Sequence, residues 1–503
     1  MHQPYYKDTL KDEFFLPWVR LHGIKDYLDM VKILSEYPDI HLTFNLVPSL
    51  IEQISDYIKG ESLDKWLNLS YKSPVELTKE EKEFILANFF SANEKNMISV
   101  YPRYYELFSK RKLKKEFSNQ DILDLQFLFN LSWIDPIYRD TYPELNEIIN
   151  KGRFFDEEEK FLVLDLQEEI LKAIIPTYKN FQESGQIEIT TSPYYHPILP
   201  LICNSKIALE ANPKAEIPKE IFSYPEDMES QIKDAIEFYE MNFKRRPSGF
   251  WPSEEAVSEH ILSSIIKNGI NWIVTDEAIL FKSLKKKRKG ELLYKAYKLE
   301  REEGRLNIVF RDRNLSDLIS FIYYLMPPKD AVDDFLGHLN NISEVLEDPF
   351  VVIALDGENA WEYYKNDGWD FLKLLYEKLS ESKKIKTVTV SEYLSKFSPK
   401  DNIKRLSAGS WIAGNFSKWM GKREKNIAWE YLTKARKDLE DSKFQIINYK
   451  LAYKLLLIAE GSDWFWWFGE DSKDFDELFR KHLSNFYTSI EKPIPDYLSK
   501  PIQ

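Results

Sequence analysis

Seven short apolar runs alternate with longer stretches in which apolar residues recur every three or four positions. The runs cover residues 40–47, 187–191, 249–251, 272–275, 306–311, 350–355 and 387–390. Runs of this length and composition are typical of buried strands, and the stretches between them are typical of amphipathic helices. Strand and helix in alternation predict a mainly parallel sheet, and this many units predict a closed or nearly closed barrel.

Two long segments lack such runs. Residues 52–180 are charged and mostly helical in pattern, and from about residue 400 helical periodicity returns over 427–439 and 444–460. Aromatic clusters at 411–419 and 463–467 accompany this second segment. We therefore predict a barrel domain over residues 1–398 with a helical insertion at about 52–180, joined near Ser398-Pro399-Lys400 to a helical domain over 399–503.

The first residues have the pattern of the end of a strand. His2-Gln3-Pro4-Tyr5 has only Met1 before it. The barrel is therefore expected to open with a truncated first strand, or with a strand whose start lies upstream of Met1.

Composition narrows the class of protein. Hydrophobic residues make up 43% of the 503 positions and charged residues 30%, as in a soluble enzyme, and we find no run near the roughly 18 apolar residues of a membrane span. A net charge of −13 repels phosphate polymers and argues against a nucleic-acid partner. The basic run Lys285–Lys289 is interpreted as a solvated loop. The single cysteine, Cys203, excludes an internal disulfide and favours a cytoplasmic location.

Polar and acidic residues gather at the ends of the predicted strands. They are Asn45, Ser192, Glu254, Asp276, Asp312, Asp356 and Glu358. The carboxyl ends of the strands host the active site in parallel α/β folds, so this clustering is typical of an enzyme.

Two of these carboxylates, Glu254 and Asp312, are what cleavage of a glycosidic bond requires. Each has a structural alternative. Glu254 follows Trp-Pro-Ser and could be an acid at a helix N-terminus, and Asp312 could pair with a neighbouring arginine. Asp317 competes with Asp312 for the role of acid.

Five segments in a fixed order carry a resemblance to a known family. They are His2-Gln3-Pro4, residues 185–190, Trp251-Pro252-Ser253-Glu254, Phe310-Arg311-Asp312 and Asp356-Gly357-Glu358-Asn359. Together they resemble the ordered sequence blocks of glycoside hydrolase family 57, and residues 463–467 are similar to its helical C-terminal region. Residues 310–317 and 194–197 are most similar to the amylopullulanase and α-amylase group.

The resemblance implies a distorted (β/α)7 barrel that acts on α-glucans such as starch, glycogen, maltodextrin and pullulan with retention of configuration. It assigns Glu254 as the nucleophile and Asp312 as the general acid/base, about 5 to 5.5 Å apart. A 4-α-glucanotransferase or a branching enzyme is the first alternative, because water and a second glucan can resolve the same intermediate. A non-catalytic glucan-binding protein is the second.

A further set of residues is expected to bind the sugar, by donating or accepting hydrogen bonds or by stacking on a ring face. The set consists of His2, Glu188, His196, Trp251, Arg311, Asp356, Glu358, Trp419 and Trp464. For His196 a structural role is an open alternative, and for each tryptophan a place in the core. An aromatic content of 15% weakly favours a carbohydrate ligand.

Metal and cofactor motifs are not found. The seven histidines are scattered, without a His-x-x-x-His or paired-cysteine spacing, and no glycine-rich nucleotide motif occurs. We therefore predict no metal ion and no cofactor. The α-glucan is the expected partner, and the oligomeric state stays open.

Overall fold

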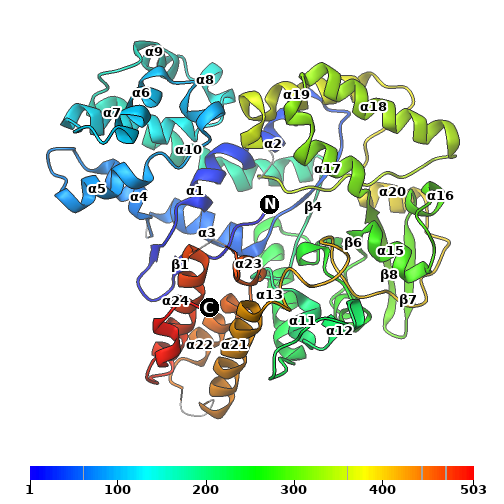
Figure 1. Ribbon diagram of the computed structural model, residues 1–503. Coiled ribbons are helices and arrows are strands. Elements are labelled where there is room, and N and C mark those ends of the chain that lie inside the picture. Colours follow the sequence, from blue (N-terminus) through cyan, green and yellow to red (C-terminus); the bar gives the residue numbers. More distant parts are fainter. Residues whose placement is uncertain (61, 359–360, 443–445, 471–472, 503) are drawn as a thin grey trace.

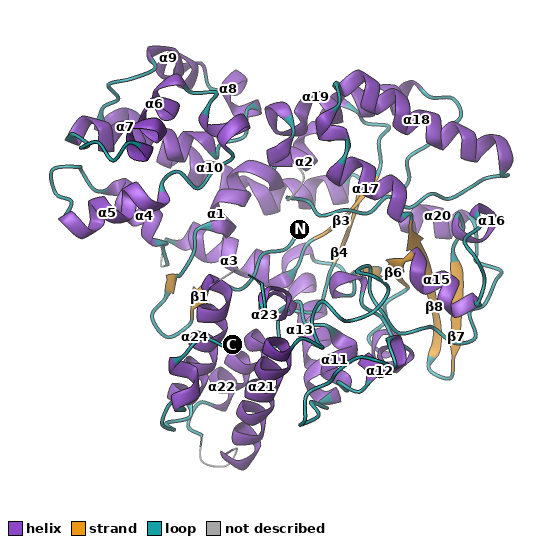
Figure 2. Cartoon of the chain, in the orientation of Figure 1, coloured by secondary structure: helices purple, strands orange, loops and turns teal. Residues whose placement is uncertain are grey.

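The computed structural model describes residues 1–60, 62–358, 361–442, 446–470 and 473–502. Three small sheets are spread across a molecule that consists mostly of helices (Figures 1 and 2). The predicted Asn359 and Phe444 lie outside the described residues. None of the described helices combines the length and the apolar character that a membrane crossing needs.

Parallel strands form the centre of the fold. β3 (Leu42–Asn45) pairs with β4 (Ile187–Thr190), and β5 (Gly249–Phe250), β6 (Trp272–Asp276) and β8 (Gly304–Arg311) form the parallel part of a four-stranded sheet. A single bridge between Thr191 and Phe250 links the two sheets. Every residue of β4 and β6 is buried, which explains their continuous apolar pattern. Five of the predicted strands are thereby confirmed.

The remaining two predicted strands are not strands in the structure. Residues 350–355 contribute only one bridge, between Val352 and Arg311. Residues 387–390 lie beside β3 through side-chain hydrogen bonds, and Thr389 caps α20 (Val390–Lys396). The described residues therefore form an α/β fold with small sheets, and a closed (β/α)7 barrel is not seen among them.

Three short strands were not predicted. β7 (Tyr297–Arg301) forms an antiparallel hairpin with β8 and occupies the edge of the sheet. β1 (Lys7–Asp8) and β2 (Glu13–Phe14) form a separate antiparallel pair. The first six residues are not strand, although the Met1 ammonium group donates to the Asn45 carbonyl oxygen at 2.9 Å, beside the end of β3.

Helices cover the sheets on both sides. They are α1 (Trp18–His22), α2 (Asp29–Lys32), α11 (Leu199–Cys203), α12 (Ile207–Ala211), α13 (Pro225–Phe243), α14 (Leu262–Lys267), α15 (Glu277–Leu284), α16 (Gly290–Leu293), α17 (Arg313–Phe321), α18 (Pro328–Val345) and α19 (Trp369–Glu381). Two short 3₁₀ turns, η4 (Ser253–Glu255) and η8 (Lys365–Gly368), carry acidic residues that matter below.

The segment predicted as a helical insertion is helical. It contains α3 (Pro48–Lys59), α4 (Lys65–Tyr71), α5 (Lys79–Asn88), α6 (Pro102–Lys112), α7 (Asn119–Ser132), α8 (Ile137–Thr141), α9 (Pro143–Lys151) and α10 (Glu157–Glu183). Capping boxes open α5, α7 and α10, where a Ser, Thr or Asp side chain and an acidic side chain three residues later satisfy the free backbone N–H groups. A buried Arg20 in α1 ties this segment to the centre, because it donates to Asp64 and Gln167.

The last part of the chain is helical as predicted. It contains α21 (Arg423–Ser442), α22 (Tyr449–Ala459), α23 (Ser462–Trp467) and α24 (Lys473–Ser489), at the bottom of Figure 1. These helices pack closely on the N-terminal residues. The Ser462 backbone N–H donates to the His196 carbonyl oxygen at 3.0 Å, and His482 Nε2 hydrogen-bonds the Tyr5 carbonyl oxygen at 2.9 Å.

Candidate active site

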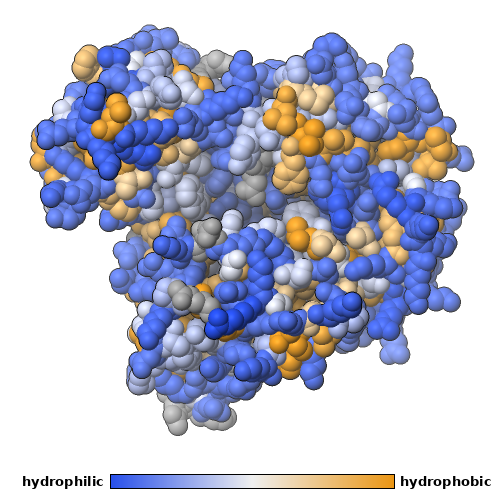
Figure 3. Space-filling view, in the orientation of Figure 1, coloured by the Kyte–Doolittle hydropathy of each residue, from blue (hydrophilic) through white to orange (hydrophobic). Residues whose placement is uncertain are grey.

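A cavity of 1760 Å³ lies where the parallel strands end. Its walls include Asn45 at the end of β3, Trp251 after β5, and Asp356 after residues 350–355. The face in Figure 3 is mostly hydrophilic and is hollowed between the upper helices and the C-terminal helices below. Pockets for small ligands usually measure about 300 to 1,000 Å³, so this cavity has room for an extended ligand.

Glu254 lines this cavity on a strained turn. Glu254 and Glu255 have φ angles of 57° and 53°, in the left-handed region that residues with a side chain rarely adopt. Trp411 holds the turn from both sides, because its backbone N–H donates to the Glu254 carbonyl oxygen and its Nε1–H donates to Glu254 Oε2 at 2.9 Å. Strain that the surroundings maintain is typical of functional sites.

The Glu254 carboxyl group holds its proton unusually tightly. Burial, followed by the charges of Asp356 and Asp463, raises its pKa to about 8, against the opposing effect of the Trp411 hydrogen bond. Asp356 is exposed and lines the same cavity. With a pKa of about 8, Glu254 retains its proton at neutral pH. The structure thus brings together Glu254 and Asp356.

Asp312 lies elsewhere. It is 1% exposed, it does not line the large cavity, and it borders a separate cavity of 400 Å³. Its Oδ2 accepts from the Tyr294 hydroxyl at 2.8 Å and from Arg288 at 3.1 Å, while its Oδ1 caps α17 by accepting from the Leu315 N–H at 2.9 Å. The structure does not bring Asp312 together with Glu254, and a role in proton transfer would require it to leave these partners.

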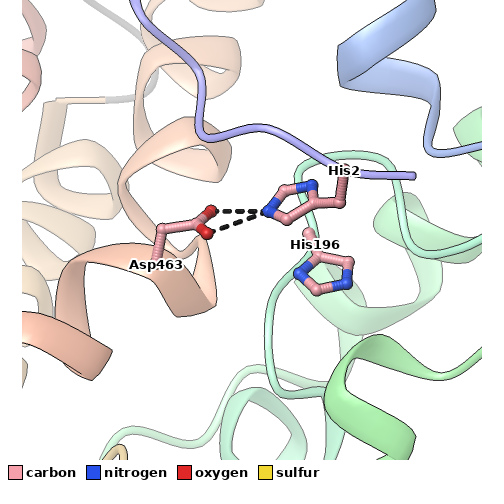
Figure 4. A group of neighbouring side chains, drawn as sticks. All are labelled: His2, His196 and Asp463. Carbon is pink, nitrogen blue, oxygen red and sulfur yellow. Dashed lines mark hydrogen bonds and ion pairs between the residues drawn. The ribbon is translucent and has the colours of Figure 1, made fainter. Parts of the chain in front are cut away.

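Three side chains from distant parts of the chain meet beside Glu254 (Figure 4). The rings of His2 and His196 stack with centroids 3.8 Å apart, and His2 Nε2 lies 2.9 Å from both carboxylate oxygens of Asp463. Burial and the neighbouring His2 lower the pKa of His196 well below its usual value, so His196 is neutral.

These three side chains offer donor atoms within 4.8 Å of one another, a spacing that one metal ion could bridge. The Asp463 carboxylate, however, is already engaged by His2. In the structure these side chains are therefore linked by hydrogen bonding and ring stacking.

Two further predicted residues support the cavity wall. Glu358 is 4% exposed and accepts from the His2 backbone N–H at 2.8 Å and the Tyr27 hydroxyl at 3.0 Å, so it fixes His2. Arg311 lies beneath the wall: its Nε–H donates to the Ala354 carbonyl oxygen at 2.7 Å and its guanidinium lies 5.4 Å from the centre of the Trp411 ring. Arg311 thereby links the segments that carry Asp356 and Glu254, without lining the cavity itself.

Glu188 also lies outside the cavity lining. Its carboxylate accepts from Trp272 Nε1 at 3.0 Å, from the Ser391 hydroxyl at 2.6 Å and from the Ser391 backbone N–H at 3.0 Å. These bonds join β4, β6 and α20. Glu188 is therefore placed to hold the strands together, and no contact with a ligand in the cavity follows from its position.

The aromatic residues divide between cavity and core. Trp419 and Trp464 are 0% and 1% exposed, and a fully buried ring offers no face for a sugar to stack on. Trp251 lines the cavity, and Trp411, Trp466 and Trp467 line it as well.

The helical periodicity of α23 explains which residues of the 463–467 cluster the sequence analysis did not place in the site. Residues 463, 466 and 467 lie on one face of α23, because positions i, i+3 and i+4 of a helix are neighbours. All three line the cavity, whereas Trp464 and Phe465 face the core. The sequence contains this spacing, but the spacing is informative only when α23 is recognised as a helix. For Trp411, which lies in a loop, no periodic signal exists.

Comparison with known proteins adds to this geometry. The α-amylase of Pyrococcus horikoshii is 26% identical over 271 residues, covering 52% of this chain and 36% of the relative. The 4-alpha-glucanotransferase of Thermococcus kodakarensis is 24% identical over 276 residues, covering 53% and 36%. The matches thus span about a third of the length of these curated relatives.

Solved structures share the fold over almost the whole chain. The GH57-type branching enzyme of Pyrococcus horikoshii has a TM-score of 0.64 at 18% identity, covering 97% of this chain and 89% of the other. The α-amylase AmyC of Thermotoga maritima has a TM-score of 0.60 at 15% identity, covering 99% and 93%. The family model described as Glycosyl hydrolase family 57 matches residues 1–405, and the chain therefore belongs to that family.

Proposed function

We propose that this chain is a retaining enzyme for α-glucans in which Glu254 is the nucleophile and Asp356 the general acid/base. One observation carries the proposal: both carboxylates line one cavity of 1760 Å³, where burial and then the charge of Asp356 raise the pKa of Glu254. Double displacement at a sugar needs one ionised and one protonated carboxyl group in the same cavity. Retention of configuration follows from the family resemblance.

The position of the proton, on Glu254 or on Asp356, determines the order of the catalytic steps. In the free protein the proton resides mainly on Glu254, whose pKa is about 8. For Glu254 to attack the anomeric carbon, the proton has to be on Asp356 when the glucan is bound. Asp356 then protonates the departing oxygen, and afterwards its carboxylate removes a proton from the incoming water or sugar hydroxyl. Trp411 supports this order, because its hydrogen bond favours the ionised form of Glu254.

Asp356 replaces Asp312 in this mechanism. Asp312 is buried and its two oxygens accept three hydrogen bonds, whereas Asp356 is exposed to the cavity. A general acid has to reach the leaving oxygen directly or through one water. Asp356 meets that condition from where it lies.

The substrate is proposed from the walls of the cavity. Trp251, Trp411, Trp466 and Trp467 supply apolar ring faces, and His2 with Asp463 supplies hydrogen-bonding groups beside the carboxylates. Sugar rings present C–H faces for the first and hydroxyl groups for the second. A linear α-1,4-glucan such as maltodextrin fits a cavity of this size, and pullulan is the substrate that would distinguish an amylopullulanase. We include a cytoplasmic location in the proposal, because Cys203 is the single cysteine.

Transfer to a second glucan is the alternative outcome of the same intermediate. The name of one relative is 4-alpha-glucanotransferase, and a structural neighbour is a branching enzyme. Incubation with maltoheptaose tests the proposal: release of reducing ends alone means hydrolysis, and products longer than the substrate mean transfer. If maltoheptaose and pullulan are bound but neither is changed, the chain is a glucan-binding protein and the proposal fails.

A further inference from the structure

Three carboxylates converge in the interior, away from the proposed active site. They belong to Asp29 in α2, Asp135 in the connection after α7, and Asp367 in η8, and one oxygen of each lies within 4.8 Å of the others. Their exposed fractions are 3%, 1% and 8%. Segments more than a hundred residues apart in the sequence thus meet at one buried acidic point.

Each of these three carboxyl groups has one unpaired oxygen in the described part of the chain. Asp29 Oδ1, Asp135 Oδ2 and Asp367 Oδ2 are buried without a partner among the described residues. The hydroxyl group of Tyr138, a residue only 4% exposed, is also buried without a partner. Burial, followed by the charges of Asp29 and Asp135, raises the pKa of Tyr138, so its hydroxyl group lies near these two carboxylates. Native proteins rarely leave buried polar atoms unpaired, and several at one point indicate a missing ligand.

The charges around this point do not balance. Lys25 Nζ donates to Asp26 at 2.8 Å and to Asp367, and His22 Nδ1 lies 2.6 Å from Asp26. Asp26 and Asp367 therefore have cationic or polar partners, whereas Asp29 and Asp135 have no cationic partner among the described residues. Burying ionised carboxylates without a counter-charge costs several kcal/mol each.

We propose that Asp29, Asp135 and Asp367 bind one hard divalent cation, with Ca²⁺ as the preferred ion. The available ligands are oxygens only, which is the donor set of Ca²⁺ and Mg²⁺ and not of Zn²⁺. An ion with oxygens at about 2.3 to 2.6 Å fits between oxygens that lie within 4.8 Å of one another. Mg²⁺ usually keeps several waters, and side chains as buried as these favour Ca²⁺.

The ion would hold together three parts of the chain and steady the proposed acid/base segment. Gly368 follows Asp367 and packs against Trp361, where a Cβ atom would come within 2.5 Å of the indole ring. Trp361 Nε1 in turn donates to the Gly357 carbonyl oxygen at 3.1 Å, directly beside Asp356. A cation at Asp367 therefore anchors the segment that carries Asp356, while its binding does not depend on the proposed catalytic role.

Metal content and thermal unfolding of the full chain test this proposal. The protein is stripped with EDTA, dialysed, equilibrated with CaCl₂ or MgCl₂, and analysed by mass spectrometry of the elements. We expect one Ca²⁺ per chain and a rise in Tm of roughly 3 to 5 °C at saturating Ca²⁺, with a smaller rise for Mg²⁺.

Isosteric variants locate the site. Asp29→Asn and Asp135→Asn are expected to lose the bound Ca²⁺ and the Ca²⁺-dependent rise in Tm, whereas Asp330→Asn, a control at an exposed position of α18, keeps both. Wild-type protein that retains no Ca²⁺, or Asp135→Asn protein that retains it in full, would overturn the proposal and leave protonated carboxyl groups as the explanation. The metal content of the wild type decides the question even if a variant does not fold.

Discussion

Replacing Glu254 with glutamine is expected to stabilise the fold while it abolishes turnover. In the unfolded chain this carboxyl group ionises at its ordinary value of 4.5, whereas in the folded protein its pKa is about 8. At pH 7 the folded protein holds a proton that the unfolded chain has released. About 2.5 pH units at about 1.36 kcal/mol each correspond to a cost of about 3 kcal/mol in the free energy of unfolding.

The direction of the Glu254 pKa shift determines how the stability cost depends on pH. Because the folded-state pKa is raised, the cost is absent below pH 4.5, grows between pH 4.5 and 8, and is constant above pH 8. Glutamine does not ionise and can still accept the Trp411 hydrogen bond. Glu254→Gln is therefore expected to gain up to about 3 kcal/mol at pH 7, with little gain at pH 5.

Thermal unfolding of wild type and variant at pH 5, 7 and 8.5 and constant ionic strength measures this gain. Turnover of maltoheptaose is expected to fall on the order of 10⁴-fold, since the nucleophile is lost. Glu347→Gln, at an exposed position, is the control and should leave Tm unchanged at every pH. A difference in Tm that is the same at pH 5 and 8.5, or a variant that is less stable at pH 8.5, would refute the reasoning.

Four further substitutions separate catalysis, binding and structure. Asp312→Asn is expected to keep kcat within about tenfold of wild type. It is expected to lose about 1 to 3 kcal/mol of stability, because the charge-assisted hydrogen bonds of Asp312 weaken. A loss of kcat with unchanged Tm would instead indicate that Asp312 is catalytic. Trp411→Phe removes the donor to Glu254 and is expected to move the acidic limb of the kcat/KM profile to higher pH, and an unmoved limb would contradict that link. Trp467→Ala is expected to raise KM for maltoheptaose up to about tenfold with kcat nearly unchanged, because Trp467 lines the cavity. Trp419 is buried, so Trp419→Phe is expected to lower Tm and leave KM unchanged. The reverse pattern would mean that the sugar ring stacks on Trp419 and not on Trp467.

The fully buried strands are the plainest in the sequence, and the edge of a sheet is the hardest part to predict. β4 and β6 are buried on both faces and stand out as continuous apolar runs. The run 350–355 looks the same, but β7 pairs with residues 304–308 at that edge of β8, and beyond them the run forms a single bridge, from Val352 to Arg311. Which strand takes an edge depends on tertiary packing, which a linear pattern does not contain.

The run 387–390, predicted as a strand, also contains a motif that favours the start of a helix. Thr389 is followed three residues later by Glu392, and the two form a capping box at the start of α20. A β-branched Thr-Val-Thr-Val pattern favours a strand, whereas the Thr-x-x-Glu spacing favours a helix start. The helix prevails because both capping bonds form, at 2.7 and 3.2 Å.

The location of the candidate site and some of its residues could be predicted from the sequence. Asp312 and Asp356 both follow predicted strands, and nothing in the local pattern distinguishes a carboxylate that caps the next helix from one that faces a cavity. Asp312 caps α17, and the loop after residue 355 leaves Asp356 exposed. The contribution of Asp463 depends on α23 packing against the first residues of the chain, a contact between positions 461 residues apart.

The most direct test of the two-carboxylate proposal compares Asp356→Asn and Asp312→Asn on substrates with poor and good leaving groups. We predict that Asp356→Asn loses at least about 10³-fold in kcat/KM on maltoheptaose, yet stays within about tenfold of wild type on 2,4-dinitrophenyl α-maltoside in the presence of azide, because that leaving group needs no proton and azide needs no base. Asp312→Asn should behave like wild type on both substrates. If instead Asp312→Asn shows the selective loss and Asp356→Asn hydrolyses maltoheptaose normally, the pairing of Glu254 with Asp356 is wrong.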